Sequence, residues 1–170
     1  MSIRQIPSST VAVTVGQVLA DEGRIFLALI DELNLGVGTE EKNVFLLRNP
    51  VASGVRLQFK EIVLVTTKVS GGTSLRYYRN PTVTAAGTAL TIENKKTDSI
   101  TGVGTAFQLP TISARGVKLD ISGAGGAGEL RHDENFEVEL LEGEDLLFTV
   151  NQPSANSTYS MNIIWAELDL

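Results

Sequence analysis

The sequence predicts an all-β protein, an antiparallel β-sandwich, and two observations carry this prediction. From Val55 to Val65 apolar residues take alternate positions while Arg56, Gln58 and Lys60 fill the others, which is the period of a strand with one wet face. Short stretches of this kind recur about every 8 to 12 residues between turn signals, without the three- and four-residue spacing of an amphipathic helix.

Composition sets further bounds. The 170 residues contain no cysteine, so disulfides, thiolate metal sites and cysteine nucleophiles are excluded together. The chain lacks a run of about 20 apolar residues, which disfavours a membrane partner, and its start has no apolar signal segment, so we expect synthesis in a cytoplasm. The 14 Lys and Arg residues are scattered singly and the net charge is −6, which disfavours nucleic acid as a partner.

The chain divides into residues 1–23, an extended N-terminal arm, and residues 24–170, a single jelly-roll-like sandwich domain. Within the arm, Val11, Val13 and Val15 alternate with smaller or polar residues and end at Gly16. Because a β-branched terminal segment gains stability by pairing, we expect this segment to pair with its own domain or with a neighbouring subunit.

The expected strands follow one another with short turns. They cover residues 24–30, 43–48, 55–65, 74–79, 105–109, 116–122, 136–141, 145–151 and 159–168. Residues 82–104, rich in Thr, Gly and Ala, are expected to form a long connection that crosses from one sheet to the other. Pro110-Thr111 is expected to be a turn and Gly123–Gly128 a flexible loop.

An Arg-Asn-Pro motif occurs twice, at Arg48-Asn49-Pro50 and Arg79-Asn80-Pro81, each time directly after an expected strand. Proline lacks the N–H that a ladder needs, and it pushes the preceding residue out of helical geometry. We therefore interpret both copies as strand terminators and not as units of a solenoid repeat, since two copies are too few.

No residue cluster amounts to an enzyme signature. The only histidine, His132, lies in an acidic run, where a solvated loop is the preferred interpretation over a zinc site, because zinc takes several His or Cys ligands. Spacing alone does not exclude a Ser-His-Asp triad, but no Gly-x-Ser-x-Gly motif supports one. We predict no catalytic residue, no metal ligand and no cofactor.

Three other features each have a structural and a functional interpretation. Glu142, Glu144 and Asp145 could offer oxygen ligands to calcium, but a solvated turn is preferred because the spacing matches no EF-hand. Trp165 is expected in the core and not on a sugar-stacking platform. Tyr77 and Tyr78 point to opposite faces of one strand, so we expect one ring in the core and the other exposed at a subunit interface.

Three segments read together resemble a known group of proteins. They are residues 43–65 (NVFLLRNPVASGVRLQFKEIVLV), 77–94 (YYRNPTVTAAGTALTIEN) and 141–168, which ends in a Trp-x-Glu strand. This order of strands and turns resembles tailed-bacteriophage virion proteins of the jelly-roll type, in particular head decoration (cement) proteins and related fibre-like proteins. Residues 1–42 fall outside the resemblance.

The resemblance implies a homotrimer on the outer capsid surface of the virion that binds the major capsid protein and stabilises the shell. Together with the residue patterns, it places Val11, Val13, Val15 and one of Tyr77 or Tyr78 at subunit or partner contacts. The alternative is a receptor- or glycan-binding module of a phage fibre or tail tip. A metal-dependent jelly-roll enzyme such as a cupin would need several histidines.

Overall fold

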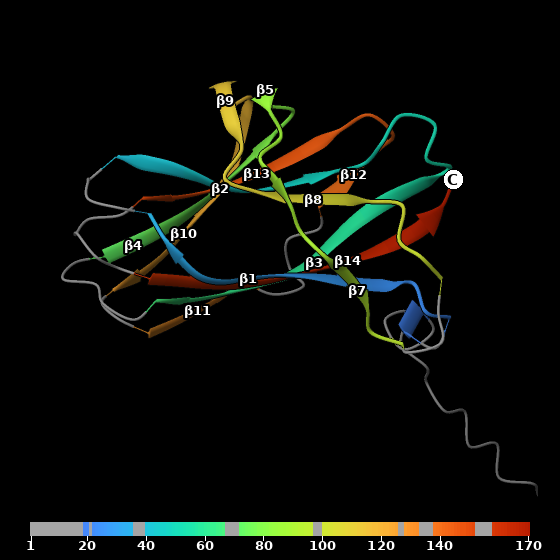
Figure 1. Ribbon diagram of the computed structural model, residues 1–170, viewed down its shortest axis with the longest axis horizontal. Coiled ribbons are helices and arrows are strands. Elements are labelled where there is room, and N and C mark those ends of the chain that lie inside the picture. Colours follow the sequence, from blue (N-terminus) through green and yellow to red (C-terminus); the bar gives the residue numbers. More distant parts are fainter. Residues whose placement is uncertain are drawn as a thin grey trace, which may run out of the picture.

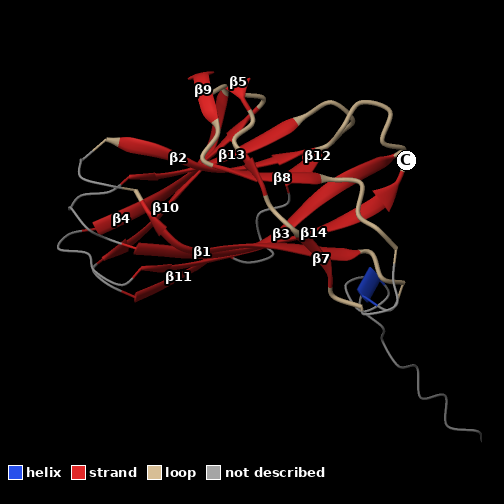
Figure 2. Ribbon diagram, in the orientation of Figure 1, coloured by secondary structure: helices blue, strands red, loops and turns tan. Residues whose placement is uncertain are grey.

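The computed structural model describes residues 19–20, 22–35, 40–66, 72–96, 100–125, 128–132, 138–151 and 158–170. Nearly all of them are strands or turns (Figure 2). The strands are β1 (Ile25–Asn34), β2 (Glu41–Arg48), β3 (Val55–Thr66), β4 (Gly72–Arg79), β5 (Thr82–Ala85), β6 (Thr88–Ala89), β7 (Ile92–Asn94), β8 (Thr105–Gln108), β9 (Thr111–Ala114), β10 (Val117–Gly125), β11 (Gly128–His132), β12 (Val138–Leu140), β13 (Asp145–Asn151) and β14 (Thr158–Asp169). Among the described residues no helix has the length and apolar character needed to cross a bilayer.

Two antiparallel sheets pack face to face, which confirms the predicted sandwich (Figure 1). Sheet A has the order β11-β3-β14-β1-β7, with β12 also paired to β3, and sheet B has the order β10-β4-β13-β2-β8-β6. The first four strands pair with the last strands in reverse order, β1 with β14, β2 with β13, β3 with β11 and β4 with β10. A double ribbon rolled up in this way is a jelly roll.

The core lies between the sheets. Burial alternates along the first half of β3, whereas β2 and β13 have runs of consecutive buried residues because their outer faces are covered as well. Phe59, Tyr77 and Phe148 form a connected aromatic group, with ring centroids 5.1 to 6.2 Å apart. Trp165 is fully buried beside Phe26, so its predicted core position is confirmed. Burial of these apolar side chains is the main stabilising contribution to such a domain.

The prediction for residues 82–104 is right about the crossing and wrong about the strands. The segment crosses from β6 in sheet B to β7 in sheet A, but it contains three short strands, β5, β6 and β7, and the chain returns to sheet B at β8. Residues 80–116 are an insertion between two strands of sheet B. Within it β5 pairs with β9, β6 with β8 and β7 with β1, so it covers one side of the sandwich.

Smaller differences concern turns. The chain at Thr111 enters β9, so Pro110-Thr111 is followed at once by a strand. Glycines expected in a flexible loop at 123–128 lie partly in strands, since β10 extends to Gly125 and β11 begins at Gly128. His132 ends β11 opposite Ile62 in place of the expected loop. The glycines favoured a loop prediction because glycine is depleted in strands. Here β4 and β3 supply the hydrogen bonds that hold the glycine-containing strands β10 and β11.

Both Arg-Asn-Pro motifs end strands, as predicted, and they hold the same turn from two sides. β13 runs between β2 and β4, so the two motifs flank its first residue, Asp145. Arg48 donates two hydrogen bonds to the Asp145 carboxylate at 2.9 and 2.8 Å. Asn80 donates its backbone N–H to the Asp145 carbonyl at 2.9 Å, and its side-chain oxygen accepts the Asp145 N–H at 3.1 Å.

Asn49 has no exposed surface, and its side-chain amide donates to the carbonyls of Val55 and Leu140 at 2.8 and 3.1 Å. Its main chain also bonds to the turn, donating to the Glu144 carbonyl and accepting from Gly143, both at 2.9 Å. One buried side chain thus joins β2 to β3 and β12.

We expect Asn49→Ala to lower the free energy of unfolding by about 3 kcal/mol, because two buried carbonyls lose their donor. The measurement is urea denaturation followed by Trp165 fluorescence. Asn80→Gly is the matched control: Asn80 has φ +51°, a conformation that glycine also adopts freely, and its side chain is exposed. It should cost about 1 kcal/mol, and equal losses in the two variants would contradict the assigned role of Asn49.

Candidate functional site

The structure places the predicted contact residues as follows. Val11, Val13 and Val15 lie outside the described residues. Tyr77 is fully buried in the core and Tyr78 is 8% exposed, so the prediction that one of the two rings is exposed is wrong. Neither ring is presented on the surface of this chain.

Tyr78 is buried because a further layer covers the outer face of sheet B. Its ring packs with Leu46 and Leu147 in a second apolar cluster, against the partly buried Val83 and Ile112 of β5 and β9. Phe107 of β8 completes this cluster. The β5–β9 pair rises above sheet B at the top of Figure 1, where it caps this cluster. The sequence pattern gave the correct alternation, but it contained no signal for the extra layer.

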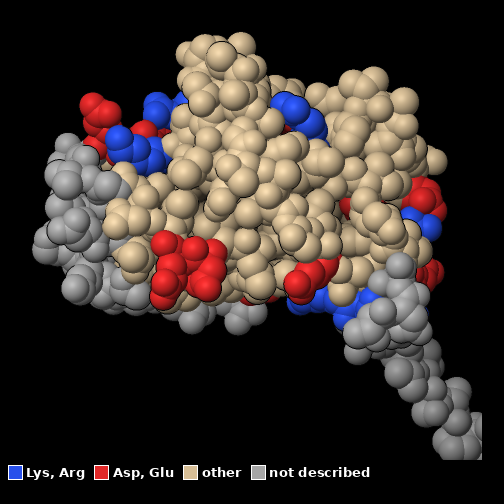
Figure 3. All heavy atoms as spheres, in the orientation of Figure 1, with Lys and Arg blue, Asp and Glu red and all other residues tan. Residues whose placement is uncertain are grey.

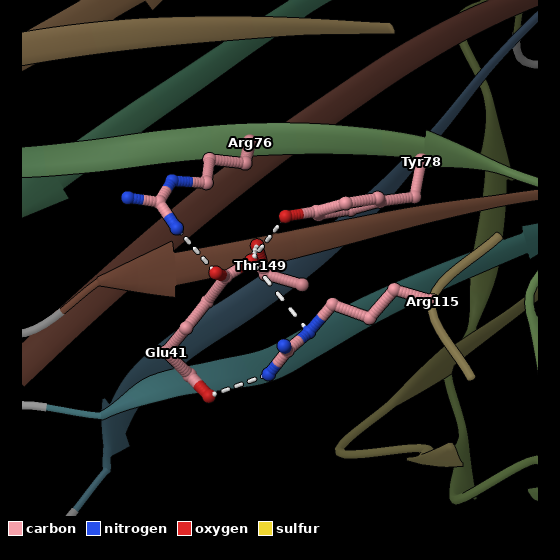
Figure 4. Close-up of polar contacts among 5 residues, drawn as sticks. All are labelled: Glu41, Arg76, Tyr78, Arg115 and Thr149. Carbon is pink, nitrogen blue, oxygen red and sulfur yellow. Dashed lines mark hydrogen bonds and ion pairs between the residues drawn. The ribbon is translucent and has the colours of Figure 1, made fainter. Parts of the chain in front are cut away.

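The hydroxyl of Tyr78 reaches a polar cluster centred on Glu41, at the start of β2 (Figure 4). Glu41 accepts hydrogen bonds from Arg76, from Thr149 and, at 2.9 Å, from Tyr78. Arg115 donates to the Glu41 carbonyl at 3.1 Å, and its Nε lies 3.6 Å from the carboxylate. These contacts join β2, β4, β13 and the β9–β10 connection, so the cluster holds these four parts of the chain together on the outer face of sheet B.

The environment keeps Glu41 ionised. Burial opposes its negative charge, but the hydrogen bonds from Thr149 and Tyr78, the charge of Arg115 and the hydrogen bond from Arg76 outweigh burial and lower its pKa. Burial and the neighbouring carboxylate together raise the pKa of Tyr78. The sequence did not predict this cluster, because Glu41 lies outside the expected strand at residues 43–48 and the two arginines lie far away in sequence.

The acidic side chains of the turn at residues 142–145 form hydrogen bonds and an ion pair within the chain. Glu142 accepts the N–H of Gly54 at 2.6 Å, and Glu144 accepts the N–H of Leu141 at 2.8 Å. Asp145 is 8% exposed and paired with Arg48, so the expectation of a solvated turn is wrong for this residue. Within the described ranges no three His, Asp or Glu side chains gather as a metal site.

The feature that stands out on the surface is a neutral face, which we define as residues 81–92 and 100–114. These two stretches contain no Lys, Arg, Asp or Glu. Figure 3 shows this side of the molecule, with uncharged residues across the middle and charged ones towards the margins. Most of its side chains are small, and many are exposed, among them Thr84, Thr88 and Ala89. The signal was present in the sequence as two long charge-free runs, but it was not recognised.

The neutral face is hollowed by a groove of about 390 Å³, with Phe26 and Leu90 among its walls and Ile100 at its margin. The buried carboxylate of Glu167 fixes one wall. It accepts the backbone N–H groups of Val103 and Gly104 at 2.9 and 2.8 Å. Because both donors are main-chain groups, this carboxylate holds the shape of the 100–104 segment.

Leu109 is the most unusual residue of the neutral face. Its φ is +53°, a left-handed conformation that costs a leucine about 1–2 kcal/mol, and 47% of its surface is exposed. The conformation is held by the hydrogen bond from its N–H to Val44 and by close packing of Gly87. A Cβ at Gly87 would lie 2.2 Å from the Gln108 carbonyl oxygen. The fold therefore holds an apolar side chain outward at an energetic cost.

No protein-family model matches the chain, and no curated protein matches it. Solved structures show weak similarity. A Podospora anserina GH26-CBM35 β-(1,4)-mannanase is 11% identical with a TM-score of 0.28, over 88% of this chain and 27% of that one. A chain from infectious bursal disease virus, Gt strain, is 14% identical with a TM-score of 0.24, over 86% of this chain and 40% of that one. This chain spans less than half of either, and similarity of this strength carries no argument about function.

We expect Glu41→Gln to lower the free energy of unfolding at pH 7 by about 2 kcal/mol, since charge-assisted hydrogen bonds become neutral ones. A carboxylate with a lowered pKa stabilises the fold above its unfolded pKa of about 4.3, and this stabilisation is lost as the pH falls through the folded pKa. The difference between wild type and variant should therefore shrink in acid, as measured by urea denaturation from pH 7 to pH 3.

Glu40→Gln is the matched control, since the side chain of Glu40 is 86% exposed and lies 3.8 Å from Lys42. It should change the stability by less than about 0.5 kcal/mol at any pH. A constant difference between Glu41→Gln and wild type from pH 7 to pH 3 would contradict the assigned role of the Glu41 charge.

Proposed function

We propose that this protein is a non-enzymatic structural protein of a bacteriophage virion. In this proposal it decorates the outer surface of the head as a homotrimer, binds the major capsid protein and stabilises the shell. The neutral face is the surface that contacts the capsid. The proposal joins the resemblance of the strand and turn order to head decoration proteins with one observation, an uncharged side of the sandwich that presents Leu109.

The neutral face has the chemistry of a protein-binding surface. Charged side chains are depleted at the centre of protein interfaces, because each would have to lose its water on binding. Exposed threonine and alanine side chains have little conformational entropy to lose, so a surface made of them is ordered at low cost. Leu109 supplies a protruding apolar group that could enter a pocket of the partner, as interface anchors do.

The strained backbone at Leu109 supports the same assignment. Conformations that cost stability persist where the surrounding structure enforces them, and they are found preferentially at functional positions. Here the enforced residue is an exposed leucine on a face whose other exposed large apolar side chains are Ile100 and Val103. A purely structural turn at this position would be served better by glycine or asparagine.

A glycan-binding module is less well supported. Such sites usually present ring faces on which sugars stack, and aromatic rings of the described residues are buried or half-buried. Phe107 is half-buried in the cluster beneath β5 and β9. Without an exposed ring in the described part of the chain, no observation favours this role over capsid binding.

The test counts copies of the protein in purified virions of the phage that encodes it, by quantitative mass spectrometry against the major capsid protein. A decoration protein should be present in numbers comparable to the capsid protein. It should stay with the heads when they are separated from the tails, and it should be lost only when the heads are stripped of bound proteins. A copy number comparable to that of tail proteins, or absence from virions, would overturn the proposal.

We expect Leu109→Asn to leave the fold as stable as wild type or stabilise it by up to about 1 kcal/mol, because asparagine tolerates positive φ. Its binding to stripped heads should fall at least about tenfold, which corresponds to the loss of one apolar anchor. Binding is measured by co-sedimentation and stability by urea denaturation.

Val51→Asn is the matched control, because Val51 is 82% exposed and lies outside the neutral face. It should bind heads as wild type does. If Leu109→Asn also binds heads normally, the neutral face is not the contact surface. This holds even if the number of copies in virions supports a decoration role.

A further inference from the structure

We infer that residues 11–15 of one copy of this protein add a strand to the free edge of β10 in a second copy. The inference deepens the proposed homotrimer and rests on that part of the proposed function. It assigns both partners of the contact, a valine-rich segment on one copy and a strand edge on the other.

The free edge of β10 is the longest that the described strands leave open. Sheet B ends at β10, which pairs with β4 from Val117 to Gly125 and has no strand on its other side among the described residues. β6, β7, β11 and β12, which also lie at sheet ends, span only two to five residues. β1 is open for the six residues beyond Ala28, where its pairing with β7 ends. An open edge carries a row of backbone donors and acceptors ready for another strand.

The end of β10 towards Gly125 suits strand addition. Gly123 and Gly125 carry no side chain that could block an approaching backbone, and no charged residue follows Asp120 in this strand. The bulge between Lys118 and Asp120 disrupts pairing only at the other end of the strand. Residues 121–125 thus form a regular and uncharged stretch of edge.

The arm has the matching sequence. Val11, Val13 and Val15 alternate with Ala12 and Thr14, so the segment carries no charge and consists mostly of residues with high strand propensity. Main-chain hydrogen bonds to an open edge supply the affinity in strand addition, and alternate side chains supply the register.

In its own chain the arm reaches the Gly125 end of this edge only in a fully stretched form. It joins the domain at Leu19, whose carbonyl accepts the Arg24 N–H, and the Arg24 carbonyl in turn accepts the N–H of Glu167. Leu19 is therefore close to the last residues of β14. Val15 and Val11 lie four and eight residues before Leu19, so they reach at most about 14 and 27 Å from it.

The receiving part of β10 lies towards the opposite end of the sandwich (Figure 1). Gly125 is three residues from Gly128, which pairs with Thr66, and Thr66 pairs with Tyr159. Tyr159 is eight residues from Glu167 along β14, a distance of about 26 Å. Val11 of the same chain would reach Gly125 only with the arm fully stretched, and Val15 would end about 12 Å short of it, which favours the arm of a second copy.

Such a contact joins two different surfaces, an arm and an edge, and is therefore heterologous. Heterologous contacts close into a ring when the rotation between subunits allows it. A ring of three is the closed form that the proposed trimer requires. The edges β6 and β10 bound opposite sides of sheet B, so this contact leaves the neutral face open to the capsid.

The experiment uses the absence of cysteine from the chain. Val13→Cys is made in one full-length preparation, and Ile121→Cys or Ser122→Cys in another that carries a mass tag, so that both faces of β10 are sampled. The preparations are mixed, allowed to exchange and oxidised mildly. We expect a disulfide between one tagged and one untagged chain, identified by mass spectrometry. Each preparation oxidised alone should give little of this product.

Two further variants provide the control. Val13→Pro removes a strand donor in the middle of the valine segment, while Ser9→Pro makes the same change outside it. By light scattering, Val13→Pro should reduce the solution mass from that of a trimer to that of a monomer and Ser9→Pro should not. Hydrogen exchange of β10 amides should accelerate at least about tenfold in Val13→Pro alone.

A solution monomer for the wild-type chain, or a trimer that Val13→Pro leaves intact with unchanged exchange in β10, would overturn the inference. So would a disulfide formed only within single chains when Val13→Cys and Ser122→Cys are combined. All these measurements use purified protein without heads, whereas the proposed decoration is tested on virions. Failure of the arm contact is therefore distinguishable from failure of capsid binding.

Discussion

The fold depends on one constraint, that the last strand must lie between the first and the third. β14 is hydrogen-bonded to β1 on one side and to β3 on the other, along almost its whole length. It also carries Trp165 into the core and Glu167 under the 100–104 segment. Arg24 and Asp169 close the same end of the pair with two hydrogen bonds of 2.7 and 2.6 Å. The rolled topology, the core and one wall of the groove thus all require β14 in place.

Alternation of apolar and polar residues predicted the long strands because each of them has one face on the core. β3 shows this from Val55 to Phe59, where Val55, Leu57 and Phe59 are inside and the residues between them half-exposed. The same alternation, extended to Val65, is wrong: beyond an irregularity in the pairing with β14 the inward residues are Ile62 and Leu64, so Val63 and Val65 lie outside the core. The same logic placed Trp165 correctly. It could not order the strands, because pairing between the two ends of the chain leaves no local trace in sequence.

The predictions from sequence are wrong where structure arises from residues far apart in the chain. The strands β5, β6 and β7 span only four, two and three residues, which is too short for a period-2 pattern to identify them, and they form because the fold brings β9, β8 and β1 beside them. Tyr78 is covered by β5 and β9, and the donors around Glu41 come from three other parts of the chain. The two charge-free runs of the neutral face are visible in the sequence, but only the fold shows that they lie on the same side of the molecule and form one surface.

The rolled order also governs how the chain can fold. Contacts between residues far apart in sequence make folding slow, because loop closure must come before their stabilisation. β14 fills the place between β1 and β3, so until β14 has been synthesised the edges of β1 and β3 that face each other stay unpaired. β14 must therefore emerge from the ribosome before sheet A can be completed, and until then open edges of neighbouring nascent chains are most exposed to mispairing.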